Sequence, residues 1–178
     1  MRNMQKAKLF FVLIALLFWN SACQNDKQIP TSLKNILPNK YFTILISYSS
    51  DCPLCQRYTQ KIRTINDSLP SNFQLYFIKV HADEKWDFDW SQPLEKQTIQ
   101  DPQSQICRKL GIKVYPQVVI LSKMGKIHYS GAIDNSATEI GTISVRITKD
   151  YLKQAIVQLS ADNQKVMPSN TAIGCFVE

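Results

Sequence analysis

The sequence predicts an α/β fold in which a mixed central β-sheet is flanked by helices. Over residues 42–80, an apolar strand, an amphipathic helix and a second apolar strand follow one another, and this order requires a parallel strand pair with a right-handed crossover. Two more apolar strands, 116–121 and 127–132, are joined by a tight turn at 124–126, which makes them a hairpin. A last amphipathic helix begins near residue 148, so helices cover the sheet.

The first strand and the helix after it are the clearest elements. Phe42 to Tyr48 is a run of β-branched and aromatic residues suited to a buried strand. After a turn at 49–51, apolar residues recur at spacings of four, four, three and four, the pattern of one helix face. They are Leu54, Tyr58, Ile62, Ile65 and Leu69. Pro53 lies in the first turn of this helix, where a missing N–H costs nothing, and Pro70 ends it.

The second half of the chain contains shorter elements. Phe73 to Val80 is the second buried strand, and residues 103–110 form a short helix that Gly111 caps. Thr148 is the expected N-cap of the last helix, whose apolar residues recur at helical spacing. They are Tyr151, Leu152, Ala155, Ile156 and Leu159.

The segment between residues 81 and 102 is ambiguous. Its aromatic residues alternate with aspartates, as in a half-buried strand or in a surface that binds a partner. They are Trp86, Phe88 and Trp90. Packing within a loop is the interpretation that we favour.

The N-terminal residues predict export. Three basic residues precede an unbroken apolar run of eleven residues from Leu9 to Trp19, and small residues follow it. This order is typical of a secretory signal peptide, which we place at residues 1–22. The apolar run is shorter than the roughly 20 residues that a membrane-spanning helix needs. An uncleaved N-terminal anchor is the alternative, and both interpretations place the domain outside the cytoplasm, attached to a membrane.

Ser21-Ala22-Cys23 resembles the lipobox of bacterial lipoproteins. The resemblance implies cleavage before Cys23 and attachment of a lipid to its thiol. The chain then divides into a linker at 23–40, a folded domain at 41–161 and an extended C-terminal tail at 162–178. We expect the protein in the periplasm or cell envelope, held to the membrane by its N-terminal anchor.

The charge of the chain gives no reason to expect a nucleic-acid partner. The formal net charge is +7, and removal of residues 1–22 takes away three basic residues and no acidic ones, which leaves +4. This excess is mild and includes no dense run of Lys and Arg. We therefore predict no binding of nucleic acid.

The five cysteines divide into three groups. Cys23 belongs to the export signal. Cys52 and Cys55 form a C-x-x-C motif, and Cys107 and Cys175 stand alone. A location outside the cytoplasm permits disulfide bonds among them.

The sequence predicts no metal site. A structural zinc site would need a second C-x-x-C motif or a Cys/His pair. The chain has only two histidines, and we interpret His81 as a loop residue and His128 as a strand residue. We also predict no cofactor.

Cys52 lies where a strand ends and a helix begins. The dipole and the unpaired N–H groups of the helix favour its thiolate, so a lowered pKa makes it a nucleophile near neutral pH. Cys55 lies one turn further along the helix, close enough to attack a mixed disulfide on Cys52 and release the product. An inert structural disulfide is the alternative, which this position and the downstream Val114-Tyr115-Pro116 disfavour.

Cys52-Pro53-Leu54-Cys55, together with Tyr115-Pro116 and the hairpin at Gly125, resembles the thioredoxin superfamily over about residues 40–160. The resemblance implies a thioredoxin-like fold and a thiol–disulfide oxidoreductase that acts on protein thiols outside the cytoplasm. It also implies that Pro116 has a cis peptide bond and faces the two cysteines. Because proline lacks an N–H, substrate backbone can lie beside the sulfur atoms, and metal capture by the dithiol is discouraged.

A closer resemblance is to bacterial redoxins of the alkyl-hydroperoxide-reductase/thiol-specific-antioxidant type. It rests on Asp51-Cys52-Pro53 and on several further stretches. These are Asp101-Pro102, Leu110-Gly111-Ile112, Tyr115-Pro116, Gly125-Lys126-Ile127, Tyr129 to Asn135, Thr148 to Leu152 and Gly174-Cys175. The resemblance implies protein thiols or disulfides as substrates and a membrane or periplasmic redox partner.

The sequence departs from thioredoxins at two positions near the motif. Ile46 stands where thioredoxins carry a buried carboxylate, six residues before the first cysteine, so another group or water must accept the proton. Asp51 replaces their tryptophan, and we expect its charge to raise the pKa of Cys52 and oppose the helix dipole. The direction of electron flow stays open, because Pro53 resembles oxidising members whereas membrane-tethered relatives are often reductants.

Three other functions remain as alternatives. A copper-binding chaperone of thioredoxin fold would use both cysteines and a histidine, but such proteins usually space the cysteines by three residues. A peroxiredoxin-like peroxidase would need a proline and a Thr or Ser ahead of its cysteine, and residues 45–51 do not match that pattern. A non-catalytic lipoprotein would use the fold for binding alone.

Cys175 has three interpretations. It could form a relay with Cys52 and Cys55, pair with Cys107, or remain a free buried thiol. We favour a structural role, because tails of exported proteins often hold a structural cysteine.

Overall fold

A computed structural model describes most of the folded part of the chain. The described residues are 33, 41–81, 83, 97–139, 142–143, 146–162 and 165–177. The predicted signal peptide, Cys23 and the alternating aromatic residues Trp86, Phe88 and Trp90 lie outside this set. So does the predicted linker apart from Leu33, which is buried in the core. None of the helices in the described part is long and apolar enough to cross a membrane.

A five-stranded mixed sheet forms the centre of the molecule, in the order β3-β2-β1-β5-β6. Its strands are β1 (Phe42–Ser47), β2 (Phe73–Lys79), β3 (Thr98–Gln100), β5 (Gln117–Ser122) and β6 (Ile127–Gly131). β1 runs parallel to β2, and β2 to β3, whereas β5 is antiparallel to both β1 and β6. Every residue of the central strand β1 and of its neighbour β5 is buried. The predicted α/β fold with a mixed sheet is therefore confirmed.

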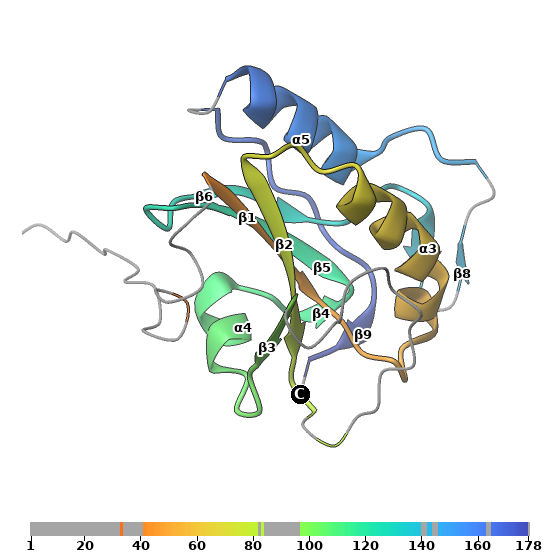
Figure 1. Ribbon diagram of the computed structural model, residues 1–178. Helices are drawn as coiled ribbons and strands as arrows, with labels where there is room; N and C mark the ends of the chain where they lie inside the picture. Colours follow the sequence, from red (N-terminus) through yellow and green to blue (C-terminus); the bar gives the residue numbers. More distant parts are fainter. Residues whose placement is uncertain are drawn as a thin grey trace, which may run out of the picture.

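Three helices in the described part of the chain cover this sheet. They are α3 (Pro53–Asp67), α4 (Gln105–Leu110) and α5 (Tyr151–Ala161). Figure 1 shows α3 and α5 on one face of the sheet and α4 on the other. Pro53 lies in the first turn of α3, and Gly111 closes α4 in the left-handed conformation at φ 69°, as expected of a glycine C-cap.

The start of α5 differs from the prediction. Thr148 is not its N-cap, because Asp150 takes that place and accepts a hydrogen bond from the backbone N–H of Lys153 at 3.2 Å. The Thr148 hydroxyl instead accepts a hydrogen bond from Asn135 Nδ2 at 2.7 Å. Both residue types are good N-caps, and here the Thr148 side chain bonds to Asn135 while Asp150 caps the helix.

Several short strands were not predicted. β3 forms an edge of the sheet, and β7 (Ala137–Glu139) pairs with β8 (Thr142–Ile143). The two-residue strand β4 (Val114–Tyr115) pairs in antiparallel register with β9 (Cys175–Phe176). The C-terminal segment, expected as an extended tail, thus returns to the domain just ahead of Pro116.

Candidate active site

The turn between β1 and α3 places Cys52 at the N-terminus of that helix. Cys52 donates its backbone N–H to Ser49 O at 3.3 Å, and Asp51 donates its N–H to the Ser49 hydroxyl at 3.2 Å. Cys52 is the N-cap, with extended φ and ψ of −85° and 116°. Its sulfur therefore lies where the unpaired N–H groups of the first turn favour negative charge.

The pKa of Cys52 is lowered from 9.0 to about 5. The largest cause is a hydrogen bond from the Cys55 thiol, which outweighs the opposing effect of burial. The thiol of Cys175 and the backbone N–H groups of Cys55 and Cys175 add to the lowering. The expected lowering of the Cys52 pKa is thus found, and Asp51, whose charge we expected to oppose it, is not among its causes.

The environment of Cys55 has the opposite effect. Its side chain is fully buried, at 0% exposure, and burial raises its pKa far above 9.0, with the neighbouring Cys52 adding to the rise. At neutral pH the pair therefore consists of a Cys52 thiolate and a Cys55 thiol. A thiolate is the attacking species in disulfide exchange, and a nearby thiol is the resolving group.

The structure brings Pro116 to the same place. The Tyr115–Pro116 peptide bond is cis, as the resemblance to thioredoxins implied. Cys52 Sγ lies 3.3 Å from the carbonyl oxygen of Tyr115, to which it donates a hydrogen bond when it is protonated. The three residues proposed from the sequence, Cys52, Cys55 and Pro116, thus lie in one site built from the start of α3 and the β4–β5 connection.

Ser47 is a positioning residue that the sequence did not single out. Its hydroxyl donates to the carbonyl of Val114 at 2.7 Å and accepts from the backbone N–H of Gln117 at 3.0 Å. It therefore bridges the backbone on both sides of Pro116 and fixes the loop to β1. A polar residue at the end of an otherwise apolar strand was the available signal, since a buried hydroxyl needs partners.

The two lone cysteines lie in different surroundings. Cys107 is buried in α4, where burial and the nearby carboxylate of Asp101 raise its pKa to about 12. Cys175 lies opposite Tyr115 in the β4–β9 pair, and the carbonyl oxygen of Tyr115 is 3.3 Å from the Cys52 sulfur. The pKa of Cys175 is raised to about 11 by burial and by the Cys52 charge. All four described cysteines are free thiols, and the structural role that we favoured for Cys175 stays a prediction.

The histidines do not join the cysteines in a metal site. His128 is buried in β6 with Nδ1 2.6 Å from the carbonyl of Lys165. His81 is an exposed residue after β2, with its ring centroid 6.4 Å from that of Tyr115. Among the described residues, no group of three or more His, Cys, Asp or Glu side chains is arranged to hold a metal ion.

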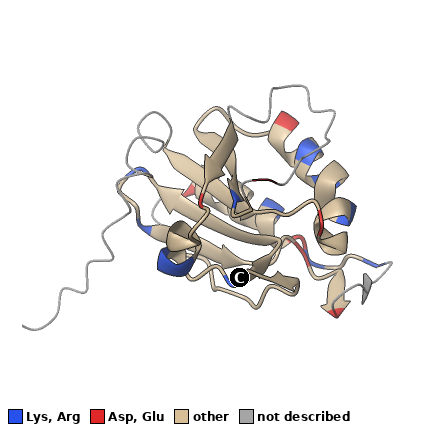
Figure 2. Cartoon of the chain, turned by 90° about the horizontal axis from the view of Figure 1, so that it is seen from below, with Lys and Arg blue, Asp and Glu red and all other residues tan. Residues whose placement is uncertain are grey.

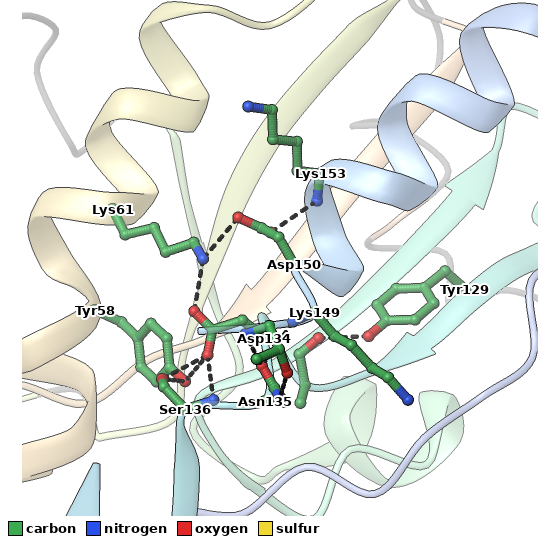
Figure 3. Close-up of polar contacts among 11 residues, drawn as sticks. Tyr58, Lys61, Tyr129, Asp134, Asn135, Ser136, Lys149, Asp150 and Lys153 are labelled. Atoms are coloured by element: carbon green, nitrogen blue, oxygen red, sulfur yellow. Dashed lines mark hydrogen bonds and ion pairs between the residues drawn. The ribbon is translucent and has the colours of Figure 1, made fainter. Parts of the chain in front are cut away.

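A buried polar cluster connects α3 to the segment after β6 and to the start of α5 (Figure 3). Asp134, with a side chain 0% exposed, accepts hydrogen bonds from the Tyr58 hydroxyl at 2.6 Å and from the Ser136 N–H at 2.8 Å. Lys61 bridges Asp134 at 2.6 Å and Asp150 at 2.8 Å. Burial opposes charge on Asp134, but these donors outweigh it and lower its pKa.

Charged residues of both signs are spread over the described surface. Figure 2 shows the face on which the C-terminal end of the chain lies, with Lys and Arg dispersed among Asp and Glu. A dispersed pattern of this kind gives a weaker directional field than a cleft lined by one sign of charge.

Comparison with known proteins identifies the fold and the family of the chain. No curated protein matches the chain. An uncharacterized conserved protein from Geobacillus kaustophilus has a similar structure, with a TM-score of 0.60 at 17% identity over 81% of this chain and 80% of that one. A hypothetical protein from Sinorhizobium meliloti has a TM-score of 0.60 at 13% identity over 80% of this chain and 82% of that one. These likenesses show a shared fold.

The sequence itself matches the family of thioredoxin-like domains over residues 29–140. The match includes β1, the C-x-x-C motif, α3 and the β4–β5 connection with its cis-proline. It covers more than half of the 178 residues. The finer resemblance to bacterial redoxins stays a prediction. The chain belongs to the thioredoxin-like domain family, and thus to the thioredoxin superfamily.

Proposed function

We propose that the protein is a thiol–disulfide oxidoreductase in which Cys52 exchanges with substrate sulfur and Cys55 resolves. One observation carries the proposal. The Cys52 sulfur lies at the N-terminus of α3 with its pKa lowered to about 5, between the buried thiol of Cys55 and the carbonyl that precedes Pro116. A stabilised thiolate beside a second, protonated thiol is the arrangement that disulfide exchange requires.

The proposed direction is oxidation of substrate thiols. A substrate thiolate attacks Cys52 in the Cys52–Cys55 disulfide, and Cys55 leaves as a thiolate that takes up a proton. A second substrate thiolate then attacks the substrate sulfur of the mixed disulfide, and Cys52 leaves as a thiolate. Two electrons pass from the substrate to the protein, and an external redox partner that accepts two electrons restores the disulfide.

The low pKa of Cys52 supports this direction. Stabilising the thiolate stabilises the reduced protein, which makes the disulfide a stronger oxidant. Thioredoxin, with a thiol pKa of about 7, has a reduction potential near −270 mV, whereas DsbA, with a pKa of about 3.5, lies near −120 mV. With a Cys52 pKa of about 5, we expect a potential between these two values.

Exchange assays with cysteine variants test the proposal. The wild type is expected to oxidise a dithiol peptide, and Cys52→Ser to lose this activity. Cys55→Ser is expected to lose most of the activity, because it cannot form the Cys52–Cys55 disulfide that the peptide thiol attacks. Cys107→Ser is the matched control and keeps the activity, since Cys107 lies in α4 away from the exchange pair. Equilibration with glutathione buffers gives the potential.

Two results would contradict the proposal. A wild-type rate no higher than that of the Cys52→Ser/Cys55→Ser double variant would indicate a protein that uses the fold for binding alone. A potential at or below that of thioredoxin, about −270 mV, would reverse the direction.

The proposal includes a location and partners. We infer export through residues 1–22, cleavage before Cys23 and lipid attachment there, which would tether the domain outside the cytoplasm by residues 23–40. The basic, apolar and small residues in this order support it. Its substrates are then protein thiols, and its redox partner is membrane-bound or periplasmic. In cell fractionation, Cys23→Ser should move the protein from the membrane to the soluble fraction; retention at the membrane would contradict lipid attachment.

A further inference from the structure

The last described strand occupies the edge next to the reactive sulfur. β9 pairs with β4 so that Cys175 faces Tyr115 and Phe176 faces Val114, and Val177 donates its N–H to Lys113 O at 3.0 Å. Figure 1 shows β9 beside β4, close to where α3 begins. On the proposed function, an extended substrate would add its backbone at this same edge, as strand addition to an exposed edge generally works.

Gly174 allows the close approach of this segment. A Cβ on Gly174 would overlap the carbonyl group of Tyr115, at 2.6 Å from its carbon, and would lie 3.3 Å from the nitrogen of Pro116. Real Cβ atoms do not come so near to backbone atoms, so a side chain here would push the segment away from the site. Glycine is the residue that permits this backbone contact.

A second fixed point lies upstream, at Asn170. Its carboxamide accepts the N–H of Ala132 at 2.7 Å and donates to the Tyr129 hydroxyl at 3.1 Å. A Cβ on Gly131 would lie 2.7 Å from the backbone oxygen of Asn170. The segment is thus held at both ends of its path, and its place on the domain is specific.

The docked segment lies beside the nucleophile and brings a thiol toward it. Cys52 is only 2% exposed, which leaves little room for a protein substrate to reach its sulfur. The Cys175 thiol is partly exposed and lies opposite Tyr115, whose carbonyl oxygen is 3.3 Å from the Cys52 sulfur. A thiol on this edge is placed beside the sulfur with which it would exchange.

We propose that residues 165–177 act as an internal substrate that closes the site, and that Cys175 is a third redox cysteine that forms a disulfide with Cys52. The Cys175 thiol gives up its proton, and its sulfur attacks Cys52 in the Cys52–Cys55 disulfide. The Cys52–Cys55 bond breaks, the Cys52–Cys175 bond forms, and Cys55 takes up a proton. No net oxidation occurs, so the step isomerises the oxidised protein and needs no further oxidant.

The closed form would regulate access to the site. While Cys175 is bonded to Cys52, a substrate thiolate has to break the Cys52–Cys175 disulfide, and the substrate backbone has to displace β9 from β4. When the segment leaves, the β4 edge and the sulfur become available together. The inference rests on the proposed function for its effect on substrate access. The Cys52–Cys175 disulfide itself can be detected without any substrate.

Disulfide mapping of the full chain tests the pairing. The protein is oxidised with glutathione disulfide, quenched with acid, alkylated and mapped by mass spectrometry without reduction. The wild type is expected to show both Cys52–Cys55 and Cys52–Cys175, and Cys55→Ser to show Cys52–Cys175 within one chain. Cys107→Ser is the control and should show the wild-type pattern. Finding only glutathione adducts or linked dimers in Cys55→Ser would overturn the proposal.

A Gly174→Ala variant tests the closure. Because the added methyl group forces the segment off the Tyr115 carbonyl, alkylation of Cys52 in the reduced protein should become about tenfold faster, the ratio that corresponds to about 1.4 kcal/mol of docking free energy. Gly111→Ala is the matched control, because its positive φ of 69° brings strain while nothing lies within 4 Å of the new Cβ. An equal rate in wild type and Gly174→Ala would overturn the closure.

The two proposals fail in different ways. If Cys52–Cys175 never forms while Cys52→Ser abolishes peptide oxidation, the oxidoreductase proposal stands and the internal substrate is wrong. If Cys52–Cys175 forms but neither wild type nor Gly174→Ala oxidises a dithiol peptide, the third redox cysteine stands and the proposed function is wrong.

Discussion

Cys52 and Cys55 lie on one turn of α3, yet their sulfur atoms ionise very differently. Cys52 receives hydrogen bonds from two thiols and two backbone N–H groups, whereas Cys55 is surrounded by the core and faces the charge of Cys52. The difference comes from position on the helix, since an N-terminal sulfur meets unpaired donors and an interior one does not.

Titration of the reduced protein checks this difference. The ultraviolet absorbance of the Cys52 thiolate is expected to appear with a midpoint near pH 5, well below the ordinary value of 9.0. Cys55→Ala removes the strongest donor and should move the midpoint upward, whereas Cys107→Ala should leave it in place. A wild-type midpoint close to 9 would show that these hydrogen bonds do not stabilise the thiolate.

At the scale of elements, one residue at the N-terminus of α5, Asp150, makes two different stabilising interactions. Asp150 caps the helix through Lys153 N–H and also forms an ion pair with Lys61 of α3 at 2.8 Å. The cap is a local interaction, whereas the ion pair joins two helices on the same face of the sheet. The two contributions can be separated because asparagine caps a helix as well as aspartate does.

Substitution of Asp150 makes that separation measurable. Asp150→Ala loses the cap and should lower the free energy of unfolding by about 1 kcal/mol. Asp150→Asn keeps the cap and loses the charge, so it should cost less than about 0.5 kcal/mol, the usual size of a partly exposed ion pair. Chemical denaturation gives both values. Equal losses in the two variants would mean that the ion pair, and not the cap, stabilises this helix end.

Elements defined by local patterns were predictable, and elements defined by distant partners were not. The apolar periodicity from Leu54 to Leu69 and the position of Pro53 predicted α3. The strand–helix–strand order predicted that β1 and β2 are parallel. β3, β4 and β9 are only two or three residues long, too short for any periodicity. The choice between Thr148 and Asp150 as cap depended on Asn135, which lies 13 residues from Thr148.

The candidate site divides in the same way. Cys52, Cys55 and Pro116 follow from motifs read along the chain. Ser47 belongs to the site because it bonds to Val114 and Gln117. Cys175 belongs to it because β9 pairs with β4. A single sequence does not specify which distant backbone a tail will pair with, so the position of Cys175 required the structure.

At the scale of the whole molecule, the cluster around Asp134 joins three parts of the fold. It ties α3 through Tyr58 and Lys61 to the segment after β6, and through Lys61 to the start of α5. Burial would raise the pKa of Asp134, but hydrogen bonds from Lys61, Ser136 and Tyr58 lower it below the ordinary value of 3.8. Its contribution to stability is therefore complete above pH 3.8 and is lost as the pH falls toward the lower, folded-state pKa.

Acid unfolding of an Asp134 variant checks this cluster. Asp134→Asn leaves Lys61 with a weaker partner and should lower the free energy of unfolding at neutral pH by about 3 kcal/mol. Below pH 4, its stability should also fall less steeply than that of the wild type. Asp67→Asn is the control, since its 4.0 Å pair with Arg63 lies on the surface and should contribute less than about 0.5 kcal/mol. Parallel acid profiles for wild type and Asp134→Asn would contradict this account.

The path of the C-terminal segment has a further consequence for the outer strand β6. Met167 and Asn170 donate their N–H groups to the carbonyls of His128 and Ser130 at 2.7 and 3.2 Å, so the segment covers an edge of the sheet that would otherwise present unpaired backbone groups. An uncovered edge is a template for strands of other molecules. Release of the segment would therefore allow the chain to self-associate. The form with the segment released would have to be short-lived, or have a substrate bound at this edge, to remain monomeric.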